Sequence, residues 1–248
     1  MKNLFYVGAF IVALFIVNEE VRADNPPCKD APTVKDIDGN VYNTVQIGNQ
    51  CWMKENLRAT KYADGTPIDQ VSSKSAKVAY WFYPNNEASN KATYGLLYNW
   101  KAVMRNSSSS SANPSGVQGI CPTGWHVPSD AEWTQLTDYV SSKSQYQCNS
   151  DSTYIAKALA STTGWNTYGG TCAVGNTPSN NNATGFGALP AGRSYNYGSF
   201  DQSARFWSAT ELSSNDAYYR DLYYPSARVY RDNDAKYYGF SVRCIKDK

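Results

Sequence analysis

One stretch, residues 121–133, constrains the fold most strongly because it combines a cysteine, a turn and the start of a helix. Ser129 followed by Glu132 has the pattern of a capping box, in which each side chain accepts a hydrogen bond from the other residue's backbone N–H. Pro128 keeps the residue before it extended, so the helix is expected to begin here. Apolar residues then recur at helical spacing and predict one buried face: Trp133, Leu136 and Val140.

The first residues are typical of an exported protein. Lys2 provides a basic start, Leu4–Val17 is an uninterrupted apolar run, and a small residue stands at Ala23. This pattern predicts a signal peptide over residues 1–23, cleaved after Ala23. The apolar run is short for a span of about 20 residues and lacks a basic stop-transfer flank, which favours cleavage over a retained anchor. No cysteine directly follows the run, so we expect a secreted or outer-surface protein and not a lipoprotein.

Removing residues 1–23 from the 248 leaves 225, enough for one large domain or two small ones. We expect residues 24–32 to form an extended lead-in and residues 33–248 a single domain. All six cysteines follow the predicted cleavage site. In an exported chain they predict three disulfides, with about 15 connectivities open. A structural zinc site is less favoured because no two cysteines have C-x-x-C spacing.

The charge and composition exclude some classes of partner. The formal net charge is only +2, whereas a nucleic-acid-binding protein needs a basic surface that displaces counterions from phosphates. The sequence contains 20 Tyr and 7 Trp but one His. Together with many Asn, Ser and Gly residues, these aromatics indicate an extracellular, β-rich protein with a polar and aromatic surface.

The periodicity along the chain predicts an α+β fold. A turn at Asp36–Asn40 opens a hairpin, and the expected strands cover residues 41–47, 51–57, 78–83, 205–209, 217–223, 227–231 and 238–245. Helical stripes are expected over 94–104, 129–140 and, for a shorter helix, from 154 to about 164. The last strand alternates Phe240, Val242 and Cys244 with Gly239, Ser241 and Arg243, which predicts one inward face. Residues 165–200 form a long loop, and its aromatics and Cys172 favour a binding loop over disorder.

With these segments placed, the chain resembles the Fibrobacter succinogenes major paralogous domain family over roughly residues 33 to 247. The resemblance is carried by seven motifs in order: DGNVYNTVQIG at 38–48, WMKENL at 52–57, YGLLYNW at 94–100, CPTGWHVPSDAEW at 121–133, GFGALPAG at 185–192, FWSATE at 206–211 and YGFSVRCI at 238–245. The resemblance implies a secreted or surface-attached bacterial protein, often discussed in terms of adhesion.

The same resemblance implies a fold similar to C-type lectins and to the formylglycine-generating enzyme. We therefore expect two main helices packed on short antiparallel sheets, with long loops and stabilising disulfides. By this resemblance Cys121 is expected to pair with Cys244, Cys148 with Cys172, and Cys28 with Cys51. The formylglycine-generating enzyme works through closely spaced cysteines near its C-terminus. Cys244 stands alone there, so that activity is not expected.

Other catalytic interpretations are weak. His126 is the one histidine, and we interpret it as a hydrogen-bonded structural residue in its turn. A glycosidase pair needs two carboxylates at a defined separation. The sequence spacing of the four candidate carboxylates gives no reason to select a pair from among them: Asp201, Glu211, Asp216 and Asp221.

A binding interpretation uses the aromatic residues, because Tyr and Trp cover apolar sugar faces and still offer a polar tip. In a lectin-like fold the long loop and the strands after it carry the ligand. The candidate residues are Trp165, Arg193, Tyr195, Tyr197, Tyr218, Arg220, Tyr224 and Arg231. No cofactor is expected. Asp36-x-Asp38 resembles the start of a calcium loop, but the distal acidic ligand is missing and a plain hairpin turn is favoured. Asp232-x-Asp234 could bind calcium and is as easily a turn.

Three functional hypotheses follow from these observations. The favoured one is a non-catalytic extracellular module that binds polysaccharide or another surface. The second is a structural subunit of a surface assembly such as a filament or sheath, in which copies self-associate. The third is a hydrolase. Neither a nucleic-acid partner nor a membrane span after signal cleavage is expected.

Overall fold

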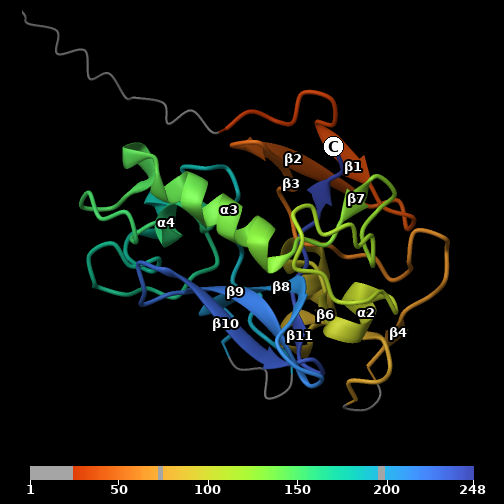
Figure 1. Cartoon of the computed structure of the whole chain (residues 1–248). Helices are drawn as coiled ribbons and strands as arrows, with labels where there is room; N and C mark the ends of the chain where they lie inside the picture. The colour runs from red at the N-terminus through yellow and green to blue at the C-terminus, as the bar shows by residue number, and fades with distance from the viewer. Residues whose placement is uncertain (1–24, 72–74, 195–198) are drawn as a thin grey trace, which may run out of the picture.

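The structure, a computed structural model, describes residues 25–71, 75–194 and 199–248 and shows an α+β fold with three sheets (Figure 1). The predicted signal peptide and the candidates Tyr195 and Tyr197 lie outside these residues. Among the helices described, α3 is the longest, with 12 residues. No helix in this part of the chain is long and apolar enough to cross a membrane.

The first sheet contains both ends of the described chain. Its order is β1-β2-β3-β12-β7, and its strands are β1 (Thr33–Lys35), β2 (Val41–Ile47), β3 (Gln50–Met53), β12 (Ile245–Lys246) and β7 (Trp125–His126). All its neighbours are antiparallel. The hairpin predicted at the Asp36–Asn40 turn is confirmed, with Val34 opposite Tyr42 in the β1–β2 register. The C-terminal strand therefore lies between two strands that come more than 100 residues earlier in the chain.

The other two sheets and the helices complete the fold. The second sheet has the order β11-β6-β5-β4, with β11 (Gly239–Phe240), β6 (Leu97–Asn99), β5 (Tyr80–Phe82) and β4 (Asp69–Gln70). The third has the order β10-β9-β8, with β8 (Ser203–Glu211), β9 (Asp216–Tyr223) and β10 (Val229–Ala235). The α-helices are α1 (Lys91–Tyr94), α2 (Trp100–Met104), α3 (Asp130–Ser141) and α4 (Ala156–Leu159). Short 3₁₀ turns cover Pro84–Asn86, Ala88–Asn90, Ser144–Tyr146 and Pro178–Asn180. The sheets are antiparallel except for the β4–β5 pair, which is parallel.

The capping box predicted at the start of α3 is confirmed. The Ser129 hydroxyl accepts from the Glu132 N–H at 3.2 Å, and the Glu132 carboxylate accepts from the Ser129 N–H at 2.9 Å. Trp133, Leu136 and Val140 are buried as expected. The ring of Trp133 lies 4.6 Å from that of Trp52 and 5.5 Å from that of Phe206, so α3 joins the first and third sheets through one aromatic core.

Two predicted helices are shorter than expected. The stripe over residues 94–104 splits into α1, β6 and α2, because Gly95 has φ +76° and lies against the backbone of Leu57. The Asn99 side chain then accepts from the Ala102 N–H and begins α2 there. The helix expected from 154 contracts to α4, which has four residues.

The prediction of one inward face at the C-terminus was wrong. The segment divides into β11 and β12, and Gly239, Ser241 and Arg243 are as buried as their neighbours. Arg243 is buried because the core supplies oxygens for its guanidinium group. It donates to Asn56 Oδ1 at 3.0 Å and to the carbonyl of Gly187 at 2.8 Å, and its guanidinium lies 4.3 Å from the centre of the Phe186 ring. A buried charge is tolerated only when its donors are satisfied in this way.

All three expected disulfides are present: Cys28–Cys51, Cys121–Cys244 and Cys148–Cys172. Three disulfides in one chain are typical of proteins that fold in an oxidising compartment. The Cys121–Cys244 bond joins residues 123 positions apart and holds the C-terminal segment beside the start of α3.

A second contact holds the C-terminus at the same place. The Nδ1 of His126 lies 2.6 Å from the carboxylate of Asp247, and its Nε2 lies 2.7 Å from the carboxylate of Glu132. Burial opposes protonation of the ring, but the hydrogen bonds and charges of the two carboxylates outweigh it and raise the pKa of His126. The protonated ring can donate to both carboxylates at once.

This arrangement predicts that stability depends on the charge of His126. Because the pKa in the folded state is raised, the stabilisation is fully present below about pH 6.5, the unfolded value, and is lost as the pH rises through the folded value. Urea unfolding between pH 6 and pH 9 should show a larger fall in the free energy of unfolding for the wild type than for His126→Gln. The difference should be about 1.4 kcal/mol per pKa unit of elevation. Parallel pH profiles for the two proteins would contradict it.

Candidate functional site

The candidate site is an open cleft of about 610 Å³ beside the turn that joins β9 to β10. Four tyrosines and one arginine line it together with smaller residues. We call it the tyrosine cleft and define it by Tyr154, Tyr168, Tyr223, Tyr230 and Arg228. They come from three separate segments: the one before α4, the long loop, and the β9–β10 turn.

Main-chain hydrogen bonds fix these three segments relative to one another. Within the long loop, the N–H of Gly175 donates to Tyr224 O at 2.8 Å and the N–H of Val174 donates to Ser226 O at 3.0 Å. From α4, the N–H of Ala156 donates to Ala227 O at 3.0 Å. The β9–β10 turn is therefore held on two sides by backbone groups, which do not depend on side-chain rotamers.

A disulfide supports the wall that the long loop provides. Cys172 lies between Thr171 and Ala173, which both line the cleft, and it is bonded to Cys148. The N–H of Cys148 donates to Tyr154 O at 3.0 Å, so the same bridge also anchors the first tyrosine.

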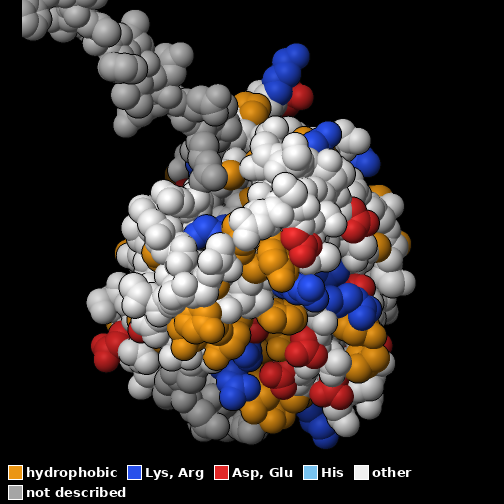
Figure 2. All heavy atoms as spheres, turned by 90° about the vertical axis from the view of Figure 1, so that its left-hand side faces the viewer, with side chains coloured by type: hydrophobic (Ala, Val, Ile, Leu, Met, Phe, Trp, Pro, Cys, Tyr) orange, Lys and Arg blue, Asp and Glu red, His pale blue; other side chains and the backbone are white. Residues whose placement is uncertain are grey.

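The rings of the cleft are unusually exposed. Seven large hydrophobic side chains in the described part of the chain are exposed, and three of them are Tyr168 at 45%, Tyr223 at 37% and Tyr230 at 45%. Figure 2 looks onto the side of the molecule where the β9–β10 turn lies, and it shows hydrophobic side chains gathered there with charged ones between them. Clustered exposed apolar groups on a folded protein indicate a binding surface.

The rings are also held in position. Tyr224, half-buried behind the cleft, makes edge-to-face contacts with Tyr168 at 5.9 Å and Tyr223 at 5.2 Å between ring centres. Gly170 lets the Tyr168 ring lie against the backbone, since a Cβ there would come within 2.5 Å of that ring. The Ser226 hydroxyl donates to the Tyr230 hydroxyl at 3.0 Å. The cleft thus offers apolar ring faces with hydroxyl groups at their edges.

Among the predicted binding residues in the described part of the chain, Tyr224 is the one that contacts rings of this cleft, although it does not line the cleft itself. Trp165 is 7% exposed, belongs to the core and donates from its indole N–H to the Ser161 hydroxyl at 3.0 Å. Arg193 lies elsewhere, with its guanidinium 5.1 Å from the centre of the Tyr238 ring and 3.8 Å from the Asp234 carboxylate.

The remaining three candidates meet at the first turn of α3. Asp130 accepts from Arg220 at 2.6 Å and from Arg231 at 2.9 Å, and Arg231 covers the Tyr218 ring with its guanidinium 3.9 Å from the ring centre. These charges are paired with each other and fasten β9 and β10 to α3. Their arrangement is that of a structural contact.

The sequence interpretation did not select the other residues of the cleft. Tyr154, Tyr168, Tyr223, Tyr230 and Arg228 are distributed over 77 positions, and no local spacing relates them. One usable signal was Tyr223-Tyr224-Pro225, where two tyrosines precede the turn of a predicted strand pair. The other was the Cys148–Cys172 bridge, which brings the first two segments together.

Three of the four carboxylates considered for a glycosidase pair have side-chain partners within the protein. Asp221 is buried, accepts from the Ser203 hydroxyl at 2.8 Å and pairs with Arg205 at 3.2 Å. Burial raises the pKa of Asp221 to about 6. Glu211 pairs with Lys236 at 2.6 Å, and Asp216 accepts from the Ser213 hydroxyl at 3.0 Å. Asp201 lies in the turn before β8, where partial burial raises its pKa.

The carboxylates of the two acidic runs accept hydrogen bonds from nearby side-chain and backbone groups. Asp36 accepts from the side chains of Asn40 and Tyr42, and Asp38 from the N–H and hydroxyl of Thr60. Asp232 and Asp234 each accept from the N–H of the next residue, at 2.8 Å. Within the described ranges, no group of three or more His, Cys, Asp or Glu side chains could hold a metal ion.

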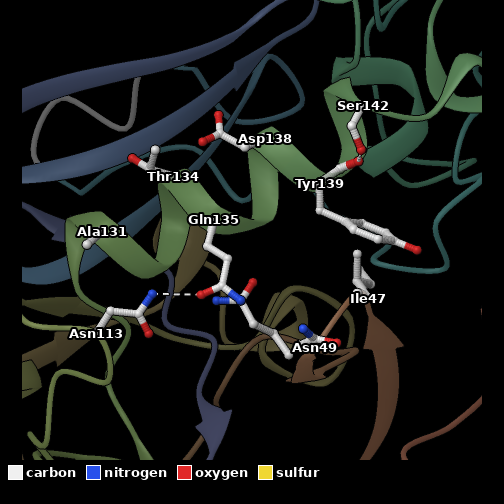
Figure 3. A pocket seen from close by; sticks show the side chains of 11 residues that line it. Ile47, Asn49, Asn113, Ala131, Thr134, Gln135, Asp138, Tyr139 and Ser142 are labelled. Carbon is white, nitrogen blue, oxygen red and sulfur yellow. Dashed lines mark hydrogen bonds between the residues drawn. The ribbon is translucent and has the colours of Figure 1, made fainter.

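A second hollow, of about 560 Å³, lies between α3 and the β2–β3 turn (Figure 3). Its lining mixes polar and apolar groups, and Asn113 and Gln135 face each other there, with a hydrogen bond of 2.7 Å. Tyr139 provides its aromatic surface and packs against Gly48, where a Cβ would approach the ring to 2.8 Å. The tyrosine cleft, with four rings, is the better candidate for a flat amphipathic ligand.

Comparison with known proteins identifies a family. A model described as the Fibrobacter succinogenes major domain matches residues 45–246, which is most of the chain and includes the whole tyrosine cleft. No curated protein and no solved structure matches the chain.

The role given to the Cys148–Cys172 bridge can be tested against a matched disulfide. It joins residues 24 positions apart, and Cys28–Cys51 joins residues 23 apart, so either double alanine variant should lose a similar free energy of unfolding, about 3.5 kcal/mol. Only Cys148→Ala with Cys172→Ala should speed hydrogen exchange at the N–H groups of Val174 and Gly175. Unchanged exchange there, or an equal rise in the control variant, would show that the bridge does not fix the cleft wall.

Proposed function

The chain belongs to the Fibrobacter succinogenes major domain family, and from this and the geometry of the cleft we propose that it is an exported, non-catalytic module that binds polysaccharide. The observation that carries the proposal is the convergence of three exposed tyrosine rings, Tyr168, Tyr223 and Tyr230, on one supported cleft. We propose adhesion to a polysaccharide surface as its role.

The chemistry of sugars suits such a cleft. A pyranose ring presents patches of C–H groups on its faces and hydroxyl groups around its edge. Tyrosine rings cover the apolar patches, and their hydroxyl groups, with that of Ser226, can exchange hydrogen bonds with the edge. Tyrosine loses little conformational entropy on binding because it has only two χ angles.

The support of the cleft favours affinity. Binding costs free energy when side chains and loops must be ordered. Here the turn that carries Tyr223 and Tyr230 is already bonded to two neighbouring segments, and a disulfide holds the third. The free-energy cost of ordering these segments when a ligand binds is therefore smaller.

Export and a lectin-like architecture are part of the proposal. Three disulfides and the signal-peptide pattern at residues 1–23 support export. The bond from Cys121, before α3, to Cys244, before the last strand, supports the lectin-like comparison. The non-catalytic assignment is supported by His126, whose two ring nitrogens both face carboxylates within the fold.

Removing two rings of the cleft tests the proposal. Polysaccharide pull-down and affinity electrophoresis would first identify a binder among plant and bacterial cell-wall preparations. The variant Tyr223→Ala with Tyr230→Ala should then bind it at least about tenfold more weakly, a loss of about 1.4 kcal/mol. Tyr218→Ala is the matched control, because Tyr218 lies on the same strand as Tyr223 but outside the cleft. Equal affinities for the wild type and the double variant would contradict the proposal.

The same experiment also tests the hypothesis that the protein is a structural subunit of a surface assembly. This hypothesis replaces the proposal if no polysaccharide is retained and the protein instead forms concentration-dependent oligomers on a sizing column. The double variant should then elute as a monomer, because the exposed rings would be the contact between copies.

A further inference from the structure

Arg228 is the charged side chain that lines the tyrosine cleft. It lies at the end of the β9–β10 turn, where its N–H donates to the Ser226 hydroxyl at 3.0 Å. The guanidinium is exposed and lies 5.6 Å from the centre of the Tyr154 ring. Such a contact places the cation beside an aromatic face without using its hydrogen-bond donors.

The charge of Arg228 is not neutralised by an ion pair. In the described part of the chain, no carboxylate lies within ion-pair distance of its guanidinium, in contrast to Arg220 and Arg231, which both pair with Asp130. The nearby carboxylate of Asp151 accepts from the N–H and hydroxyl of Thr153 at 2.8 and 2.7 Å. Those hydrogen bonds, and then the charge of Arg228, lower the pKa of Asp151, which does not line the cleft.

An arginine in this position has a definite preference among sugars. Its planar fork of N–H donors matches a carboxylate with two parallel hydrogen bonds. A uronic acid carries its carboxylate in the plane of the ring edge. When the sugar face covers a tyrosine, the carboxylate can project sideways toward an arginine at the border of the cleft. A neutral sugar would leave the cation without a partner.

We infer that the ligand of the tyrosine cleft is a carboxylated polysaccharide, one rich in uronic acid, and that Arg228 determines this specificity. The inference rests on the proposed function, because it concerns the same cleft. It assigns the tyrosines to the sugar faces, which all polysaccharides share, and Arg228 to the acid group, which only some possess.

Polygalacturonate and its fully methyl-esterified form are the probes, because they share one sugar backbone and the ester replaces each charged carboxylate by a neutral methyl ester. The wild type should bind polygalacturonate about tenfold more tightly than the ester in isothermal titration at low salt, and this margin should shrink as salt is added. Arg228→Gln should lower the affinity for polygalacturonate much more than the affinity for the ester, so that the two affinities become equal. Arg228→Lys should retain only part of the preference.

Lys143→Gln is the matched control, since it also removes one positive charge that lies beside a tyrosine ring, here Tyr139, but it lies outside the cleft. Equal binding of acid and ester, with Arg228→Gln like the wild type, would overturn the inference and leave the proposed function standing. Dextran sulfate bound as tightly as polygalacturonate would also overturn it, because the site would then accept any anion. If no polysaccharide binds at all, the proposed function fails first and the inference fails with it.

Discussion

The attachment of the C-terminal segment to the start of α3 is the constraint on which the rest of the structure depends. One covalent bond, Cys121–Cys244, and one ionic contact, His126 with Asp247, act at the same place. Between them β12 completes the first sheet by pairing with β3 and β7. Because the joined residues lie 123 positions apart, the bond removes a large share of the unfolded chain's conformational freedom. It also fixes the position and direction of α3, around which the aromatic core is built.

A short series of contacts connects the tyrosine cleft to α3 and holds it in position. Asp130, in the first turn of the helix, pairs with Arg220 of β9 and Arg231 of β10. The turn that carries most of the cleft joins these two strands. The carbonyl groups of this turn accept backbone hydrogen bonds from α4 and from the long loop, and the Cys148–Cys172 bond supports that loop. The arrangement follows a common division of roles, in which a packed scaffold positions loops and the loops carry the binding residues. Figure 1 shows this succession from α3 through β9 and β10.

Local signals in the sequence were sufficient for the first hairpin and the start of α3, but not for the other helices, the last strand or the candidate site. The capping box at Ser129 is a four-residue pattern with one geometric solution, so it could be predicted directly. Gly95 failed as a signal because its effect depends on the backbone of Leu57, which is close in space and distant in sequence. Arg243 looked like a surface residue because the oxygens that satisfy it lie on other segments. The cleft could not be predicted from the sequence for the same reason. Tyr168 and Tyr223 can be placed side by side only when the disulfide and the strand register are known, and no pattern along the chain contains both.

The central claim is that the exposed rings of the cleft form the surface that a polysaccharide covers. Nitration of tyrosines, located by mass spectrometry with and without bound polysaccharide, tests it most directly. Tyr168, Tyr223 and Tyr230 should be nitrated in the free protein and protected in the complex. Tyr42 and Tyr98 should resist in both states, because both are fully buried and burial raises their pKa values. Protection of tyrosines elsewhere, with these three rings still reactive in the complex, would contradict the account.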